Sequence, residues 1–217
     1  MKPISRSTQW LVWGGLGAVM LVVTALYLAG RFSPTGTPTV EPGADRLPMI
    51  SRLEPFTLTN QDARPVTLDG LRGKVWVADV IFTRCAGPCL QMTQRMRELE
   101  ATLDRQAPVE FLSFTTDPEF DTPEVLKSYA GRLGADSRRW QFVTGLKPQL
   151  FRVMIDGLKF TALEKKPEDR TDPYDLFIHS TIFIVVDKQG RVRKAVEGLE
   201  PDYKSKVLAV VNQLAKE

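Results

Sequence analysis

Both cysteines of the chain lie in one stretch, Asp79-Val80-Ile81-Phe82-Thr83-Arg84-Cys85-Ala86-Gly87-Pro88-Cys89-Leu90. An apolar run at 75–82 leads into the cysteines, and a helical pattern of apolar residues at 91–103 leads away from them. This pattern predicts that the pair lies on a loop where a buried strand passes into a helix. Unpaired backbone N–H groups and the helix dipole favour negative charge at a helix start. A thiolate there is a better nucleophile and a better metal ligand, so we expect the functional site at this loop.

The composition favours one globular domain and excludes several classes of protein. Of the 217 residues, 43% are hydrophobic and 25% are charged, which is enough apolar material for a full core and argues against a disordered chain. The formal net charge is only +3 and the basic residues are scattered among acids, which argues against nucleic acid as a partner. Two cysteines and one histidine supply fewer ligands than the four of a closed structural zinc site.

Residues 10–29 form an uncharged apolar stretch, and we expect it to be a membrane anchor. A helix of this length, at about 1.5 Å per residue, is long enough to cross a hydrocarbon core of roughly 30 Å. Lys2 and Arg6 precede the stretch and Arg31 follows it, a weak bias that places residues 1–9 in the cytoplasm and the C-terminal domain in the periplasm or outside. A cleaved signal peptide is the alternative.

The rest of the chain divides into a linker and a domain. Residues 30–48 are rich in proline, glycine and threonine and have no apolar period, which predicts a flexible linker. Residues 49–217 begin with two alternating segments, 56–59 and 66–68, that predict a hairpin. Strand and helix patterns then alternate, which predicts an α/β sheet with parallel central strands and a site at their carboxyl ends. The long polar segment 159–177 is expected to be an irregular loop, and loops of this length are usually functional.

The two cysteines can act as a redox pair, as soft-metal ligands or as a structural disulfide. Cys85 and Cys89 would share one face if helical, so both sulfurs can reach one ion or each other. A disulfide that closes so short a loop gains little from loop closure, so a functional pair is favoured.

His179 is the only histidine and stands between the polar segment and a strong strand pattern. It is either an ordinary polar residue or a third ligand, and two thiolates with an imidazole suit Cu(I).

Two aspartates and two methionines raise further alternatives. Asp79 lies inside an otherwise apolar strand, where an unpaired carboxylate is costly. It is either a proton acceptor or electrostatic tuner for a cysteine, or a residue that reaches water or a backbone donor. Asp117 ends the next strand, and a turn-forming role before a proline is favoured over contact with a metal ligand. Met92 and Met96 share helical spacing, so we expect them in the core rather than at a copper site.

These features together resemble the Sco/SenC family of membrane-anchored, thioredoxin-like copper proteins. The resemblance covers about residues 50–215. It rests on the N-terminal anchor, on Phe82-Thr83-Arg84-Cys85-Ala86-Gly87-Pro88-Cys89, on Asp117-Pro118-Glu119 followed by Asp121-Thr122-Pro123-Glu124, and on His179-Ser180 leading into Ile184-Val185-Val186-Asp187 and Gly190. Leu90 stands where the family usually has proline, and Ala86 where it often has one.

The resemblance implies a thioredoxin-like α/β domain at 49–217, with an N-terminal hairpin and an inserted long loop. It implies that Cys85, Cys89 and His179 bind copper, as Cu(I) or Cu(II). The protein would then deliver copper to the binuclear copper site of cytochrome c oxidase, or reduce the cysteines of that site. Its partner would be the copper-site subunit of the oxidase or another copper or thiol client. The alternative function is a metal-independent, membrane-anchored thiol–disulfide oxidoreductase, in which Cys85 and Cys89 are the redox pair.

Overall fold

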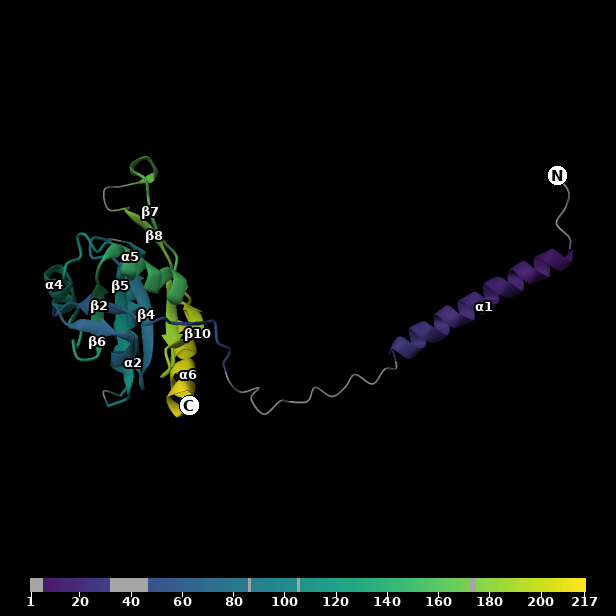
Figure 1. The fold of residues 1–217 in the computed structure, drawn as a ribbon, viewed down its shortest axis with the longest axis horizontal. Helices are drawn as coiled ribbons and strands as arrows, with labels where there is room; N and C mark the ends of the chain where they lie inside the picture. Colours follow the sequence, from purple (N-terminus) through teal and green to yellow (C-terminus); the bar gives the residue numbers. More distant parts are fainter. Residues whose placement is uncertain (1–5, 32–46, 86, 105, 172–174) are drawn as a thin grey trace. The chain divides into compact units, whose positions relative to one another are not determined.

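The computed structural model describes residues 6–31, 47–85, 87–104, 106–171 and 175–217 (Figure 1). It divides into two units, residues 1–46 and 47–217, and each is considered by itself. In the first unit, α1 (Arg6–Arg31) contains the apolar stretch of the sequence. Over the part of the chain that is described, no helix is both long enough and apolar enough to span a bilayer. The anchor at residues 10–29 therefore stays a prediction.

Two further expectations for the first unit fall largely outside the described residues. The linker expected at 30–48 includes residues 32–46, and the N-terminal segment expected at 1–9 includes residues 1–5. Neither of these stretches is described. The domain itself begins at Leu47 in the structure, close to the start expected at residue 49.

An eight-stranded sheet forms the centre of the second unit, with strand order β1-β10-β9-β4-β5-β6-β2-β3 among the described residues. Pairing of β4 with β5 and of β5 with β6 is parallel, and pairing of β4 with β9 is antiparallel. The expected parallel centre is thus confirmed, as is the hairpin of β2 with β3. The strands are β1 (Ser51–Arg52), β2 (Thr57–Asn60), β3 (Pro65–Thr67), β4 (Val75–Ile81), β5 (Val109–Thr115), β6 (Trp140–Thr144), β9 (Ile182–Val186) and β10 (Arg191–Glu197).

Helices cover both faces of the sheet. The side chains of β4 alternate between these faces, and β4 is therefore buried along its whole length. Val77 and Ile81 pack in one core with α3 (Pro88–Thr102), α4 (Pro123–Leu133) and α6 (Tyr203–Lys216). Trp76 and Val80 pack in the other core, where α2, α5 and η1 contribute the covering residues. These shorter elements are α2 (Leu68–Leu71), α5 (Lys147–Phe151) and the π-helix η1 (Arg152–Gly157), and a 3-10 turn, η2 (Pro167–Asp169), lies further along.

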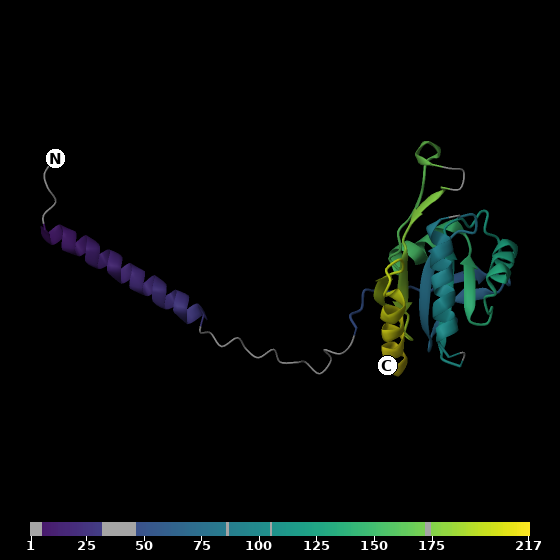
Figure 2. The same cartoon turned by 180° about the vertical axis from the view of Figure 1, so that it is seen from behind.

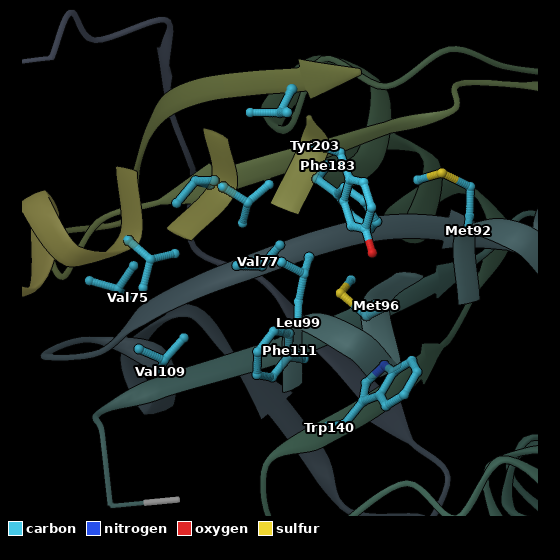
Figure 3. Packing of buried hydrophobic residues seen from close by; sticks show 14 of the residues in the cluster. Val75, Val77, Met92, Met96, Leu99, Val109, Phe111, Trp140, Phe183 and Tyr203 are labelled. Atoms are coloured by element: carbon cyan, nitrogen blue, oxygen red, sulfur yellow. The ribbon is translucent and has the colours of Figure 1, made fainter. Parts of the chain in front are cut away.

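The methionines of α3 belong to the core, as their spacing predicts. Met92 and Met96 are fully buried, and Figure 3 shows Met96 near Leu99 and Trp140, and Met92 on the side of Phe183 and Tyr203. Both belong to the cluster that α6 closes with Tyr203. A methionine is an adaptable apolar filler, and the packing of these two needs no metal to explain it.

The polar segment 159–177 is irregular in its middle, as the sequence indicates, but not at its ends. Its ends form an antiparallel hairpin of β7 (Ala162–Glu164) and β8 (Phe177–His179), which extends beyond the end of the main sheet (Figures 1 and 2). Residues 172–174 lie outside the described residues. The hairpin forms because Ala162 and Phe177 bury their side chains, although its outer side chains remain polar or exposed.

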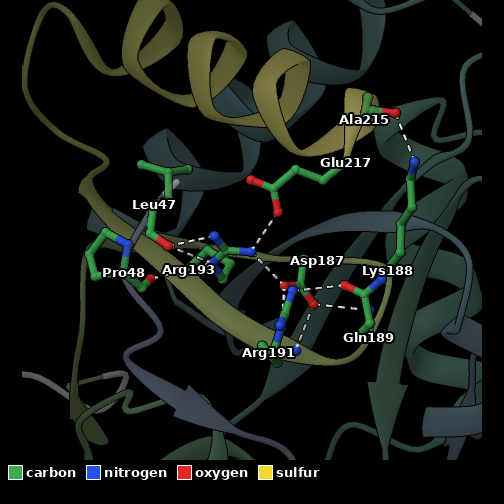
Figure 4. Close-up of polar contacts among 9 residues, drawn as sticks. All are labelled: Leu47, Pro48, Asp187, Lys188, Gln189, Arg191, Arg193, Ala215 and Glu217. Carbon is green, nitrogen blue, oxygen red and sulfur yellow. Dashed lines mark hydrogen bonds and ion pairs between the residues drawn. The ribbon is translucent and has the colours of Figure 1, made fainter. Parts of the chain in front are cut away.

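A buried arginine joins both ends of the domain to the turn between β9 and β10 (Figure 4). Arg193 donates to Asp187 over 2.8 Å, to the side chain of Glu217 over 2.9 Å, and to the backbone carbonyl of Leu47. Arg191 donates to the same Asp187 carboxylate over 2.7 Å. Asp187 and Arg193 are almost wholly buried, so each charge is compensated where water cannot reach it.

Candidate metal centre

The strand-to-helix loop places the two cysteines as the sequence predicts. Pairing of β4 with β5 ends at Ile81 opposite Thr115, and the chain then leaves the sheet in a turn. The N–H of Cys85 closes this turn by donating to the carbonyl of Phe82 over 3.2 Å. Pro88 opens α3, a position where its missing N–H has no cost. Cys85 therefore lies on the loop, and Cys89 lies in the first turn of the helix. Ala86 lies outside the described residues, and Leu90 is exposed on α3.

Three soft donor atoms meet at the end of β4. The sulfurs of Cys85 and Cys89 and a ring nitrogen of His179 all lie within 4.8 Å of one another. Cys89 Sγ is 2.8 Å from His179 Nε2, and both cysteines are free thiols. Cys89 is fully buried, whereas Cys85 and His179 are half-buried. Among the three donors, the solvent-accessible ones are therefore Cys85 and His179.

The ring orientation of His179 is fixed by its backbone neighbour. His179 Nδ1 lies 3.1 Å from the carbonyl oxygen of Ser180. A carbonyl oxygen only accepts, so Nδ1 carries the proton and donates it. Nε2, the other ring nitrogen, faces the two sulfurs and is the nitrogen that can bind a metal once it carries no proton.

The β7–β8 hairpin brings His179 to the cysteines through aromatic packing. Phe82, directly after β4, packs edge-on against Phe177 at 5.3 Å between ring centroids and against the His179 ring at 5.9 Å. Phe82, Phe177, Leu176 and Cys89 form a small buried cluster of their own. Sequence reasoning missed this contact, because an aromatic residue after a buried strand is equally compatible with the main core.

The two thiols have opposite electrostatic environments. The pKa of Cys85 is lowered to about 4, and the largest cause is a hydrogen bond from Cys89. Burial raises this pKa, whereas hydrogen bonds from His179 and from backbone N–H groups lower it further. The same hydrogen bond, burial and the charge of Cys85 raise the pKa of Cys89 far above its ordinary value. At neutral pH the site therefore holds one accessible thiolate and one buried thiol that donates to it.

This asymmetry predicts a flat pH profile for alkylation of Cys85. Because the pKa of Cys85 lies near 4, its thiolate is fully formed above about pH 5, and the rate with iodoacetamide should change less than about two-fold between pH 6 and pH 8. An ordinary thiol gains nearly ten-fold per pH unit in this range. The Cys89→Ala variant removes the donor and should restore that slope. A ten-fold rise per unit in the parent would contradict the assignment.

The structure favours one of the two interpretations of Asp79 left open by the sequence. Asp79 is fully buried, and neither carboxyl oxygen makes a hydrogen bond to the described residues. Burial raises its pKa to about 7, and Ser113, opposite it on β5, offsets part of that rise without reaching hydrogen-bond geometry. The charge of Asp79 in turn raises the pKa of Cys89. Asp79 is therefore an electrostatic influence on the buried thiol.

Asp117 combines the turn expected for it with a contact beside the cysteines. Its carbonyl accepts from the N–H groups of Phe120 and Asp121, which makes the turn. Its carboxylate pairs with Arg84, the residue before Cys85, over 2.5 Å, and the Arg84 guanidinium lies 4.1 Å above the Phe120 ring. The charge of Arg84 is thus already neutralised and is not directed at the thiolate.

The donor set suits a soft monovalent cation. Two sulfurs and an imidazole nitrogen converge within 4.8 Å, and thiolate sulfur favours soft ions, of which Cu(I) is one. Three donors are fewer than a closed structural zinc site requires. A sheet of this topology with a Cys-x-x-x-Cys loop and a histidine at its edge defines a thioredoxin-like protein with a thiol-based metal site.

Comparison with known proteins identifies the family within this class. Residues 47–216 match the SCO1/SenC family, and the chain belongs to that family. The chain is 38% identical over 155 residues to the SCO1 protein homolog of Bacillus subtilis (strain 168), a match that covers 70% of this chain and 77% of the relative. The thioredoxin-like fold implied by the sequence resemblance is thereby confirmed.

Solved structures agree with this assignment. The crystal structure of a SCO1/SenC family lipoprotein from Bacillus anthracis str. Ames is 34% identical, with a TM-score of 0.65 and coverage of 76% of this chain and 95% of that one. BsSco, a member of the Sco family of cytochrome c oxidase assembly proteins, is 28% identical, with a TM-score of 0.63 and coverage of 78% and 98%. ScoI of Bradyrhizobium japonicum, solved with copper bound, is similar in fold, with 21% identity, a TM-score of 0.58 and coverage of 74% and 98%.

Proposed function

We propose that this protein binds one copper ion through Cys85, Cys89 and His179 and serves in assembly of the binuclear copper site of cytochrome c oxidase. The observation that carries the proposal is the convergence of three soft donors within 4.8 Å at the end of β4. Membership of the SCO1/SenC family supports it, as do the copper bound in ScoI of Bradyrhizobium japonicum and the description of BsSco as an oxidase assembly protein. The client is the copper-site subunit of the oxidase or another copper or thiol protein.

The three ligands have separate tasks in metal exchange. Cys85 is the accessible thiolate and meets the incoming copper or a client ligand first. Cys89 must give up a proton when it becomes a ligand, and His179 supplies a neutral nitrogen whose orientation the Ser180 carbonyl fixes. Two thiolates and copper as Cu(I) leave a single net negative charge. This arrangement binds copper and still leaves one side open for transfer.

Titration of the full-length, reduced chain with Cu(I) against a competing chelator tests the proposal. The parent should bind one copper per chain, with two sulfurs and one nitrogen in its X-ray absorption spectrum. The His179→Ala variant should bind at least about ten-fold more weakly. The Ser180→Ala variant keeps the backbone carbonyl that orients His179, and serves as the matched control. If His179→Ala leaves affinity and spectrum unchanged, the three-ligand site is refuted.

The second candidate function is thiol–disulfide exchange, which the unequal thiols favour. The Cys85 thiolate attacks a client disulfide and forms a mixed disulfide, releasing one client thiolate. Cys89 then loses its proton and attacks the Cys85 sulfur, which releases the second client thiolate and leaves a Cys85–Cys89 disulfide. Two electrons pass to the client. A disulfide switch is described for BsSco, which is 28% identical to this chain. The two functions are compatible, because only the reduced pair holds copper.

We also propose that residues 10–29 anchor the chain in the inner (cell) membrane by a single pass. Residues 1–9 would then lie in the cytoplasm, and 30–48 would link the anchor to a domain in the periplasm or outside. The uncharged apolar stretch within α1 supports this, and SCO1/SenC relatives include a lipoprotein. Alkaline carbonate should leave the full chain in the membrane pellet and extract a variant that lacks residues 10–29. Extraction of both would refute the anchor.

A further inference from the structure

The turn that carries Cys85 is held by a buried carboxylate on a different loop. Asp121 has no exposed surface, and it lies between β5 and α4. Its two carboxylate oxygens accept from Thr83 at two points, the backbone N–H over 3.2 Å and the side-chain hydroxyl. A third hydrogen bond comes from the hydroxyl of Thr115, the last residue of β5. The carboxylate thus joins the end of one central strand to the loop that follows the other.

These contacts fix an orientation as well as a distance. Residues 82–85 form a turn, in which the N–H of Cys85 donates to the carbonyl of Phe82. Thr83 is the second residue of this turn. A residue held through both its N–H and its hydroxyl by the two oxygens of one carboxylate cannot rotate about the turn. Phe82 points to the β7–β8 hairpin, and Arg84 points to Asp117. Cys85 follows directly, so its direction depends on the turn being held at Thr83.

We propose that Asp121 is a positioning residue for the metal site: by holding Thr83 it keeps the Cys85 sulfur directed at Cys89 and His179. This inference rests on the proposed function and adds a residue that touches neither the metal nor the three ligands. A site whose donors are held in place before the metal arrives binds it more tightly, because less conformational freedom is lost on binding. Asp121 supplies that preorganisation from 38 residues away in the sequence.

Substitution of Asp121 by asparagine tests the inference. The amide keeps the size of the carboxylate but replaces one acceptor oxygen with an N–H donor, so the charge-assisted hydrogen bonds that the two oxygens accept from Thr83 are weakened. The expected result is Cu(I) binding at least about ten-fold weaker than in the parent, measured on the full-length reduced chain. Asp187→Asn is the matched control, because Asp187 is an equally buried carboxylate that holds Arg193 and contacts no residue of the Cys85 turn. It should destabilise the domain without changing copper affinity.

A second pair of variants tests the other end of the contact if Asp121→Asn does not fold. Thr83→Val keeps the shape of the side chain and loses the hydroxyl, so copper binding should weaken. Thr83→Ser keeps the hydroxyl and should match the parent, a rescue that a general loss of stability would not give. The double variant Thr83→Val/Asp121→Asn should be no weaker than the worse single variant, because both break the same contact.

The outcomes separate this inference from the proposed function. If the parent binds no Cu(I), the proposed function fails. If the parent binds Cu(I) and Asp121→Asn or Thr83→Val binds it equally well, the proposed function stands and the positioning role is refuted. Equal weakening in Asp187→Asn would also refute it, because the loss would then follow stability and not the turn.

Discussion

Replacing Cys89 by alanine is expected to weaken Cu(I) binding by more than about 100-fold and to leave Cys85 able to form mixed disulfides that persist. Groups that only orient a ligand already contribute roughly 10- to 100-fold to metal affinity, so loss of one of three donors must exceed that. The persistence follows from the number of cysteines. Cys89 is the only other cysteine, so without it no internal thiol can attack the Cys85 sulfur and release the client.

Chelator competition measures the first effect, and mass spectrometry after incubation with oxidised glutathione measures the second. Cys85→Ala is the informative counterpart: it should lose copper to the same extent but form no mixed disulfide, because Cys89 is fully buried and its pKa is raised. Met92→Leu, one turn further along α3, controls for loss of a sulfur from the same helix and should keep both properties. Mixed disulfides on Cys85→Ala, or full copper binding by Cys89→Ala, would contradict the assigned division of tasks.

The second large effect concerns stability and comes from Asp79. Its pKa rises from 3.8 to about 7 on folding, because burial disfavours the carboxylate. Between these values the folded state keeps a proton that the unfolded state releases, so the free energy of unfolding falls as the pH rises through this window. At about 1.4 kcal/mol per pKa unit, the loss between pH 4 and pH 8 is about 4 kcal/mol.

Asp79→Asn cannot ionise, so its stability relative to the parent should increase by about 4 kcal/mol from pH 4 to pH 8. Urea unfolding of the full, metal-free, reduced chain at each pH measures this difference. Asp187→Asn should behave in the opposite sense. Burial raises the pKa of Asp187, but hydrogen bonds from Arg193 and Arg191 outweigh it and lower the pKa, so that carboxylate stabilises the parent at neutral pH and less so as the pH falls towards 4. A constant difference for Asp79→Asn would show that Asp79 is not buried as a neutral acid.

The sequence predicts the elements that local pattern determines. The apolar run ending at Phe82 and the spacing of Met92, Met96 and Leu99 specify the central strand and the helix after the cysteines. The donor set could also be predicted, since Cys85, Cys89 and His179 include every cysteine and histidine of the chain. The strand and the helix could be predicted because each depends on residue type at short range, and the donor set could be named because the chain has no other cysteine or histidine.

What the sequence does not predict depends on contacts between distant segments. The β7–β8 hairpin has strands of three residues, too short to show an alternating pattern, and it is stabilised by Phe177 meeting Phe82 almost a hundred residues away in the chain. The contact of Asp121 with Thr83 could not be predicted from the sequence either, because no local pattern at either residue indicates the other as its partner. Both features need the sheet to be assembled before they exist.

The arginine between the two ends of the domain has a mechanical consequence. Tension arriving through residue 47 passes to Arg193 and from there to Asp187 and Glu217, so it is carried by β10 and the end of the chain. β4, the strand that leads into the cysteines, is separated from β10 by β9. A pull on either end of the domain therefore loads the β10 side of the sheet and spares the Cys85 turn, so the copper ligands keep their spacing under load.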